Sequence, residues 1–281
     1  MRILLVSLVA ALASVPVNAQ QMSPEVKAAV DALNAETHCY AFPGPDPSIS
    51  RPVCVWWPKN APNAELPVIY MADGMLGIYV AAIDIKPALE LGKVSPFMIV
   101  SVNAKEKPEE RADEYVNTRS GAAFEAHEAW LVQKVIPWAE QTKRASKERS
   151  KRFIGGFSNG ADLAWSLANR HPDLFGGALI HSPTGASAAW VGEQVATQRW
   201  VITGGTDELR GSIRRGAQLP RDIIYALDKR GAAVRGCIGR WEHEVRAWRQ
   251  LTPGSITWLM GLGTPQAVEN AIERGNCKTD Y

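Results

Sequence analysis

The fold is decided by residues 152–170, which read RFIGGFSNGADLAWSLANR. The first part, RFIGG, is a short apolar run that predicts a strand, and the last part, ADLAWSLANR, is rich in Ala and Leu and predicts a helix. Between them stands Gly156-Phe157-Ser158-Asn159-Gly160, which has the spacing G-x-S-x-G. Between a strand and a helix this spacing forms a nucleophile elbow, a sharp turn that lifts a serine hydroxyl above the sheet. Ser158 is therefore the candidate nucleophile.

Strands and helices are predicted to alternate on both sides of this elbow. The predicted strands are residues 53–57, 68–71, 97–102, 152–155, 178–181, 200–203 and 234–238. The predicted helices are residues 24–33, 124–143, 161–170, 221–229 and 244–260. Val- and Ile-rich runs with little polar alternation are typical of strands buried on both faces of a parallel sheet. With the elbow, this order predicts an α/β-hydrolase fold, a mostly parallel central sheet with helices on both faces. Pro137 should kink the long helix or end it early.

A base and an acid should follow Ser158 in chain order, because a serine hydroxyl is a weak nucleophile until a base takes its proton. His243 lies after the last predicted strand and before the final predicted helix, where this fold carries its base. The acid should follow the strand at 200–203, where Asp207 and Glu208 are neighbours. Either carboxylate could orient His243 and stabilise its imidazolium, and spacing does not choose between them.

Two backbone N–H groups are expected to form an oxyanion hole, which binds the negative charge that develops on the attacked carbonyl. One should be that of Asn159, directly after the nucleophile. The other should come from the loop after the strand at 68–71, where Gly74 permits a sharp turn. This places the N–H of Met75 or Leu76 toward the site.

The N-terminal residues 1–19, MRILLVSLVAALASVPVNA, have the pattern of a secretory signal peptide. Arg2 is followed by a short apolar stretch, and Val17 and Ala19 are small residues at a cleavage site. The stretch is shorter than the roughly 20 apolar residues that cross a bilayer, although an uncleaved anchor is the alternative. We expect an exported protein, periplasmic or secreted, in which residues 20–281 form a single domain without a membrane span.

Export makes disulfides the expected state of the four cysteines, for which three pairings exist. Cys39 and Cys54 close a short Pro- and Gly-rich loop and form the most local pair. Cys237 then pairs with Cys277, and four free thiols are the alternative. The cysteines do not have the spacing of a zinc site.

Composition points to an ordinary globular protein. The 281 residues carry a formal net charge of +2, and 46% of them are hydrophobic. No basic block favours nucleic acid as a partner. The chemistry inferred above calls for neither a metal nor an organic cofactor, and the sequence leaves the oligomeric state open.

Seven segments in a fixed order resemble the esterase D family of α/β-hydrolases, which includes exported esterases similar to enterochelin esterase. They are VIYMADG (68–74), RADEY (111–115), VIPWAEQ (135–141), RFIGGFSNGADLAW (152–165), HPDLFGGALIHSP (171–183), GGTDE (204–208) and HEVRAWRQL (243–251). The resemblance implies that Glu208 is the acid, with Asp207 in reserve. The chain departs from the family pattern at Ala161, where a second glycine is common, and at Trp241-Glu242 before His243.

These observations predict an exported serine esterase that hydrolyses a small-molecule carboxylic ester through an acyl-enzyme on Ser158. An acyltransferase on the same scaffold is the alternative, and a non-catalytic periplasmic binding protein is a weaker one. The segment 182–198, which includes Trp190, could contribute a cap or acyl pocket, or Trp190 could simply pack. Arg111, Glu114 and Tyr115 of RADEY form a polar cluster that is expected to brace the site through ion pairs, with contact to substrate as the alternative.

Overall fold

We describe a computed structural model of the chain for residues 24–186, 191–208 and 218–263. Its centre is an eight-stranded sheet with the strand order β1-β2-β4-β3-β5-β6-β7-β8. The strands are β1 (His38–Pro43), β2 (Ser50–Trp56), β3 (Val68–Ala72), β4 (Met98–Val102), β5 (Arg152–Phe157), β6 (Gly177–His181), β7 (Arg199–Gly205) and β8 (Ala233–Gly239). Strand β2 pairs antiparallel with β1 and β4, and the pairs from β4 through β8 are parallel. The predicted α/β-hydrolase fold is confirmed.

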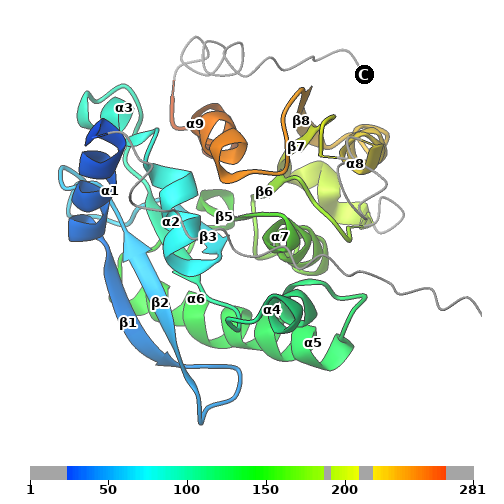
Figure 1. Ribbon diagram of the computed structural model, residues 1–281, viewed down its shortest axis with the longest axis horizontal. Coiled ribbons are helices and arrows are strands. Elements are labelled where there is room, and N and C mark those ends of the chain that lie inside the picture. Colours follow the sequence, from blue (N-terminus) through cyan, green and yellow to red (C-terminus); the bar gives the residue numbers. More distant parts are fainter. Residues whose placement is uncertain (1–23, 187–190, 209–217, 264–281) are drawn as a thin grey trace, which may run out of the picture.

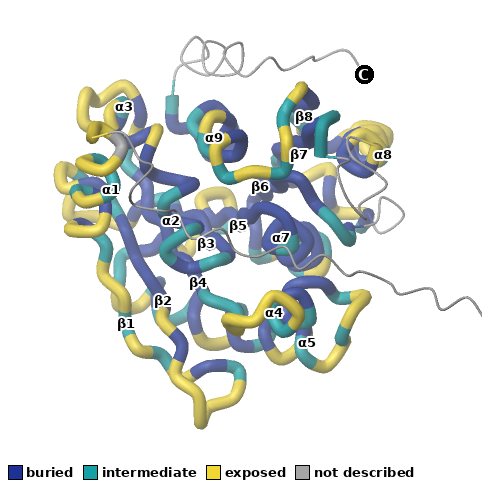
Figure 2. The backbone as a smooth tube through the Cα atoms, viewed as in Figure 1, coloured by how far each residue is buried: buried dark blue, intermediate teal, exposed yellow. Residues whose placement is uncertain are grey.

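Helices cover both faces of the sheet (Figure 1). The α-helices are α1 (Pro24–Glu36), α2 (Gly74–Ala82), α3 (Lys86–Glu90), α4 (Pro108–Tyr115), α5 (Gly121–Trp130), α6 (Ile136–Thr142), α7 (Asn159–Arg170), α8 (Gln218–Asp228) and α9 (Val245–Met260). Apolar residues of α1, α2, α3 and α9 pack on one face, and those of α5, α6, α7 and α8 pack on the other. Because successive side chains of a strand point to opposite faces, β3 contributes Tyr70 to one core and Ile69 to the other. Figure 2 shows the resulting buried sheet between helices whose outer sides are exposed.

The parallel strands bring distant segments to one edge of the sheet. The connections that leave β3, β5, β6, β7 and β8 all start at the carboxyl ends of these strands, which lie together in a parallel arrangement. This edge is where open α/β sheets bind their ligands. It therefore collects the loop before α2, the elbow before α7 and the residues that follow β7 and β8.

The long helix predicted at 124–143 is interrupted before Pro137. Helix α5 passes into a π-helical turn, Leu131–Val135, and α6 then begins at Ile136 with Pro137 in its first turn. A proline in a helix removes one N–H donor and its ring clashes with the carbonyl four residues earlier. The wider π turn accommodates both effects, so the chain stays helical through Pro137.

Residues 39–54 form a β-hairpin rather than the irregular loop expected from their Pro and Gly content. Strand β1 is an edge strand whose residues are mostly exposed, which weakens its signal in the sequence. Cys39 lies directly opposite Cys54 in the β1–β2 register, and the two form the expected disulfide. Cys237 is also disulfide-bonded, but Cys277 lies outside the described residues, so the Cys237–Cys277 pair stays a prediction.

The expected signal peptide, residues 1–19, lies outside the described residues. Among the helices that the structure describes, none has the length and apolar character needed to cross a membrane.

Candidate active site

Ser158 occupies the tight turn between β5 and α7. Its backbone has φ 55° and ψ −130°, a strained combination for a residue with a side chain. The flanking glycines are required by close contacts: a Cβ on Gly156 would lie 2.2 Å from the carbonyl oxygen of Gly160. A Cβ on Gly160 would lie 2.7 Å from the Cβ of Ala72 at the end of β3. The sequence G-x-S-x-G therefore folds here as an elbow, with the serine side chain at the edge of the sheet.

The structure brings Glu208 and His243 together, although 35 positions separate them in sequence. Nδ1 of His243 lies 3.2 Å from Oε2 of Glu208. The other oxygen, Oε1, accepts hydrogen bonds from the backbone N–H of Gly205 and the hydroxyl of Ser182, both at 2.7 Å. Both carboxylate oxygens are thus engaged, so Glu208 is held in one orientation toward the imidazole.

Asp207 makes no contact with His243 in the described residues. Its side chain is 41% exposed and lies 3.8 Å from Arg240. The side chain of Glu208 is only 7% exposed. Of the two carboxylates that the sequence left as candidates, Glu208 is the one that contacts His243.

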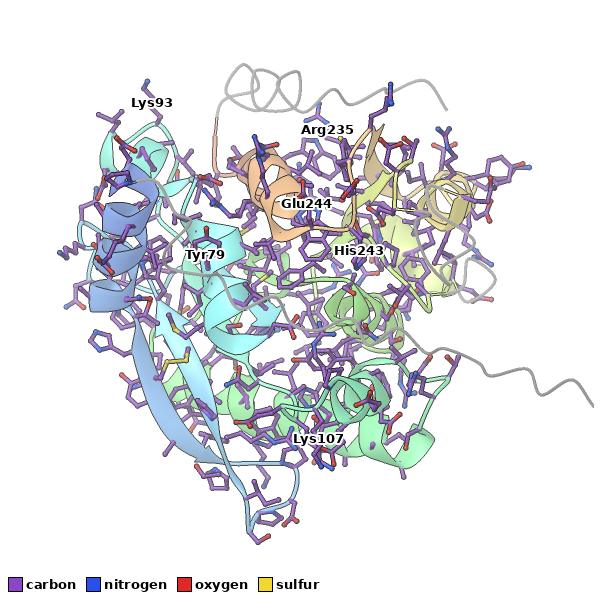
Figure 3. All side chains as sticks on the ribbon, viewed as in Figure 1. Tyr79, Lys93, Lys107, Arg235, His243 and Glu244 are labelled. Atoms are coloured by element: carbon purple, nitrogen blue, oxygen red, sulfur yellow. A yellow bond between two sulfur atoms is a disulfide. The ribbon has the colours of Figure 1, made fainter. Side chains whose placement is uncertain are left out.

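Trp248, on the first turn of α9, contacts both the residue before Ser158 and the ring of His243. Its ring stacks on Phe157, next to Ser158, at a centroid distance of 4.7 Å. It also meets the ring of His243 edge-on, at a centroid distance of 5.0 Å. Figure 3 labels His243 in the segment between β8 and α9. The indole N–H of Trp248 donates to the hydroxyl of Ser182 at 2.9 Å. Ser182 and Trp248 lie in two of the family-like segments, HPDLFGGALIHSP and HEVRAWRQL, but no spacing in the sequence indicated that they contact Glu208 and His243.

The second ring nitrogen of His243, Nε2, has no hydrogen bond within the described residues. It is buried, and the first nitrogen, Nδ1, faces Glu208. The hydroxyl of Ser158 instead lies 3.5 Å from Oδ1 of Asn159. Hydrogen bonds between catalytic groups are often long in ligand-free sites and tighten when substrate binds.

Two helices begin beside Ser158 and supply candidate oxyanion donors. Asn159 is the first residue of α7 and Met75 is the second residue of α2, where N–H groups have no acceptor within their own helix. The N–H of Leu76 donates to the carbonyl of Asp73 at 3.1 Å. Of the two candidates in this loop, Met75 is therefore better placed to donate than Leu76.

A family model described as Putative esterase matches residues 48–213, more than half of the chain. The chain belongs to this family. It is therefore a hydrolase that acts on ester bonds, and the resemblance seen in its sequence motifs is confirmed. Among curated protein sequences, none matches the chain.

Solved structures of other esterases share its fold. A ferulic acid esterase has 14% identity and a TM-score of 0.65, with 80% of this chain and 98% of that chain covered. A fluorophosphonate-binding serine hydrolase from Staphylococcus aureus has 15% identity and a TM-score of 0.58, with 80% and 98% covered. The enterochelin esterase from Shigella flexneri has 16% identity and a TM-score of 0.60, with 82% of this chain and 59% of that chain covered.

A small cavity of this esterase lies along α7, beyond Ser158. Its volume is about 120 Å³, and its lining residues are Asn117, Thr118, Asp162, Trp165, Ser166, Gly185 and Ala186. The buried carboxylate of Asp162 accepts the backbone N–H groups of Thr184, Gly185 and Ala186, which fixes the loop after β6. Part of the segment expected to form a pocket thus does line a cavity, whereas Trp190 lies outside the described residues.

Two other histidines of the esterase, His181 and His127, are buried inside the protein. Burial lowers the pKa of His181 to about 3, and its ring nitrogens lie 2.7 and 3.2 Å from the hydroxyls of Thr203 and Thr252. Burial likewise lowers the pKa of His127 to about 4. Both stay neutral at physiological pH and are enclosed by the protein, unlike a base that must reach substrate.

Proposed function

We propose that the chain is an exported serine esterase that hydrolyses a carboxylic ester through an acyl-enzyme on Ser158. The observation that carries this proposal is the convergence at one sheet edge of a strained serine elbow and an oriented Glu208–His243 pair. Family membership supports hydrolysis of esters, and the geometry adds a role for each residue.

In this mechanism Ser158 attacks the ester carbonyl while Nε2 of His243 takes its proton. Glu208 keeps Nδ1 protonated and stabilises the imidazolium that forms. The N–H groups of Asn159 and Met75 bind the oxyanion, and their helix N-termini add a favourable positive potential. His243 then protonates the leaving alcohol. A water molecule, activated by the same histidine, releases the acid and restores Ser158.

Two of the structures that share the fold are named a ferulic acid esterase and an enterochelin esterase, so a feruloyl ester and a siderophore ester are the first compounds to test.

Export is supported by the leader-like residues 1–19 and by the disulfide Cys39–Cys54, since disulfides persist in oxidising compartments. Peptide mapping of the protein from its native compartment under non-reducing conditions should give a chain starting at residue 20 with Cys237 joined to Cys277. Four alkylatable thiols, or a retained leader, would contradict this proposal.

Labelling with a fluorophosphonate, followed by assay on a panel of esters, tests the activity. We expect one labelled peptide, containing Ser158, and hydrolysis of at least one ester. Ser158→Ala should abolish both, whereas the matched variant of an exposed serine, Ser95→Ala, should retain both. An added alcohol acceptor separates the two enzyme classes, because an acyltransferase would yield a new ester in preference to the free acid.

A further inference from the structure

We propose that Arg111 is a positioning residue that holds together the two backbone segments of the oxyanion hole, an inference that rests on the proposed function. Its guanidinium makes a two-pronged ion pair with Asp73, with Nε 2.6 Å from Oδ1 and Nη2 2.8 Å from Oδ2. Its remaining nitrogen, Nη1, donates to Oδ1 of Asn159 at 3.3 Å. One side chain therefore contacts the turn before α2 and the first residue of α7.

The turn before α2 needs external support. Asp73 has φ 70°, and Gly74 follows with φ 55°, so two consecutive residues adopt the left-handed conformation. A Cβ on Gly74 would lie 1.7 Å from the side-chain oxygen of Asn103, so a glycine is required there. The side chain of Asp73 makes no capping bond to α2. An aspartate before a helix usually accepts a hydrogen bond from a backbone N–H of the first turn. Here the carboxylate of Asp73 pairs with Arg111 instead.

Helix α4 supplies a second support for the same turn. The hydroxyl of Tyr115 accepts the backbone N–H of Asp73 at 3.1 Å and donates to the carbonyl of Val102 at 3.3 Å. Arg111 and Tyr115 are four residues apart, which places them on one face of α4. Glu114, on the same helix, makes a buried ion pair with Arg51 that fixes α4 to β2. The polar residues of RADEY thus brace the site, as the sequence predicted.

The second contact of Arg111 acts on the elbow. Oδ1 of Asn159 accepts from Arg111 and also lies within 3.5 Å of the hydroxyl of Ser158. The two turns touch directly, because a Cβ on Gly160 would lie 3.0 Å from Oδ2 of Asp73. A shift of Arg111 would change the separation of the Asn159 and Met75 N–H groups, which must converge on a single oxygen.

Arg111 also changes the electrostatic potential at the proposed oxyanion hole. The carboxylate of Asp73 lies in the oxyanion turn, where an unpaired negative charge would oppose the charge developing on the substrate carbonyl. The guanidinium engages both of its oxygens and so neutralises it. Lysine would keep the charge, but its single ammonium cannot reproduce the planar contacts to two partners.

The test compares the steady-state kinetics of three variants on an ester that the wild type hydrolyses. They are Arg111→Met, Arg111→Lys and a double variant that combines Arg111→Met with Asp73→Asn. Asparagine tolerates the left-handed conformation of residue 73. We expect kcat to fall about 10- to 100-fold in Arg111→Met with KM within about threefold, a smaller loss than removal of a donor itself. Arg111→Lys should recover part of this loss, and so should Asp73→Asn in the Arg111→Met background.

The matched control is Arg119→Met, which removes an exposed arginine paired with Asp113 and should leave kcat unchanged. A wild-type kcat in Arg111→Met would overturn the inference. So would a rise in KM with constant kcat, which indicates substrate binding, or a loss that neither Arg111→Lys nor Asp73→Asn relieves. If Arg111→Met does not fold, Arg111→Lys decides, since a wild-type kcat there contradicts a need for the two-partner contact. Failure of the proposed function is distinct, because the wild type itself would then neither label with fluorophosphonate nor hydrolyse esters.

Discussion

The two halves of the active site are built in different ways. The nucleophile half, formed by the turns at 72–76 and 156–160, depends on strained backbone, with positive φ at Asp73, Gly74 and Ser158. The other half, formed by the residues after β7 and β8, depends on side-chain hydrogen bonds between Glu208, His243 and their partners. Strained turns fix the position of atoms that must not move, whereas a histidine that exchanges protons needs orientation and some freedom. The two halves should therefore respond differently to substitution.

The largest effect is expected at the nucleophile. Ser158→Ala should lower kcat by roughly 10⁴- to 10⁶-fold, as for other triads, because no other group can form the acyl-enzyme. The change removes only a hydroxyl and keeps the Cβ, so the backbone strain is unchanged and the melting temperature should stay close to that of the wild type. His243→Ala should cost nearly as much activity. Progress curves at high enzyme concentration, with a thermal melt, provide the measurement, and retained turnover in folded Ser158→Ala contradicts the mechanism.

A smaller effect, on the order of 10²- to 10⁴-fold in kcat, is expected for Glu208→Gln, because nucleophile and base remain while the imidazole loses its partner. The amide can still accept from Gly205 and Ser182, so the protein should fold normally. Asp207→Asn is the matched control and should be nearly silent, since Asp207 is partly exposed. The reverse pattern, with Asp207→Asn harmful and Glu208→Gln silent, would show that the acid is assigned to the wrong residue.

The difference between the two halves of the site also explains which site residues could be predicted from the sequence. Ser158 and its elbow were predictable because strand, turn and helix are contiguous in the sequence. The choice between Asp207 and Glu208 was not accessible from spacing, because it depends on Ser182 and on a histidine 35 positions away. Only the resemblance to a family favoured Glu208.

Elements were missed for related reasons. Helix α2 begins at strained residues and is apolar on all sides, so it has no helical periodicity to detect. Helix α4 is short and highly charged, and reads as a loop. Yet α4 carries the supports of the oxyanion turn, whose bonds to Asp73 only the folded chain reveals. The long, periodic helices α7 and α9 were found close to their observed ends.

The smallest effect is expected on stability at acid pH, and it arises from the buried His127. His127 packs against the rings of Tyr115 and Trp130, and neither of its ring nitrogens has a hydrogen-bond partner in the described residues. The groups that face it are Glu114, with Oε2 3.7 Å from Nδ1, and Arg51, which is paired with that carboxylate. Burial outweighs the attraction of Glu114 and lowers the pKa of His127 from 6.5 to about 4.

The sign of the pH effect follows from this shift. Below pH 6.5 the unfolded chain takes up a proton that the folded chain refuses until about pH 4, so the free energy of unfolding decreases as the pH falls through this window. For a shift of this size the loss is on the order of 3 kcal/mol at the acid end.

His127→Leu is close in volume and cannot be protonated. The difference in unfolding free energy between this variant and the wild type should therefore shift in favour of the variant when the pH falls from 7.5 to 4.5. The buried His181 remains and has a pKa shifted in the same direction, so some acid sensitivity should persist. Urea unfolding at both pH values measures the difference, with the exposed His38→Leu as control. Unfolding free energies that run parallel for wild type and His127→Leu across this range would mean that His127 is protonated in the folded protein and pairs with Glu114.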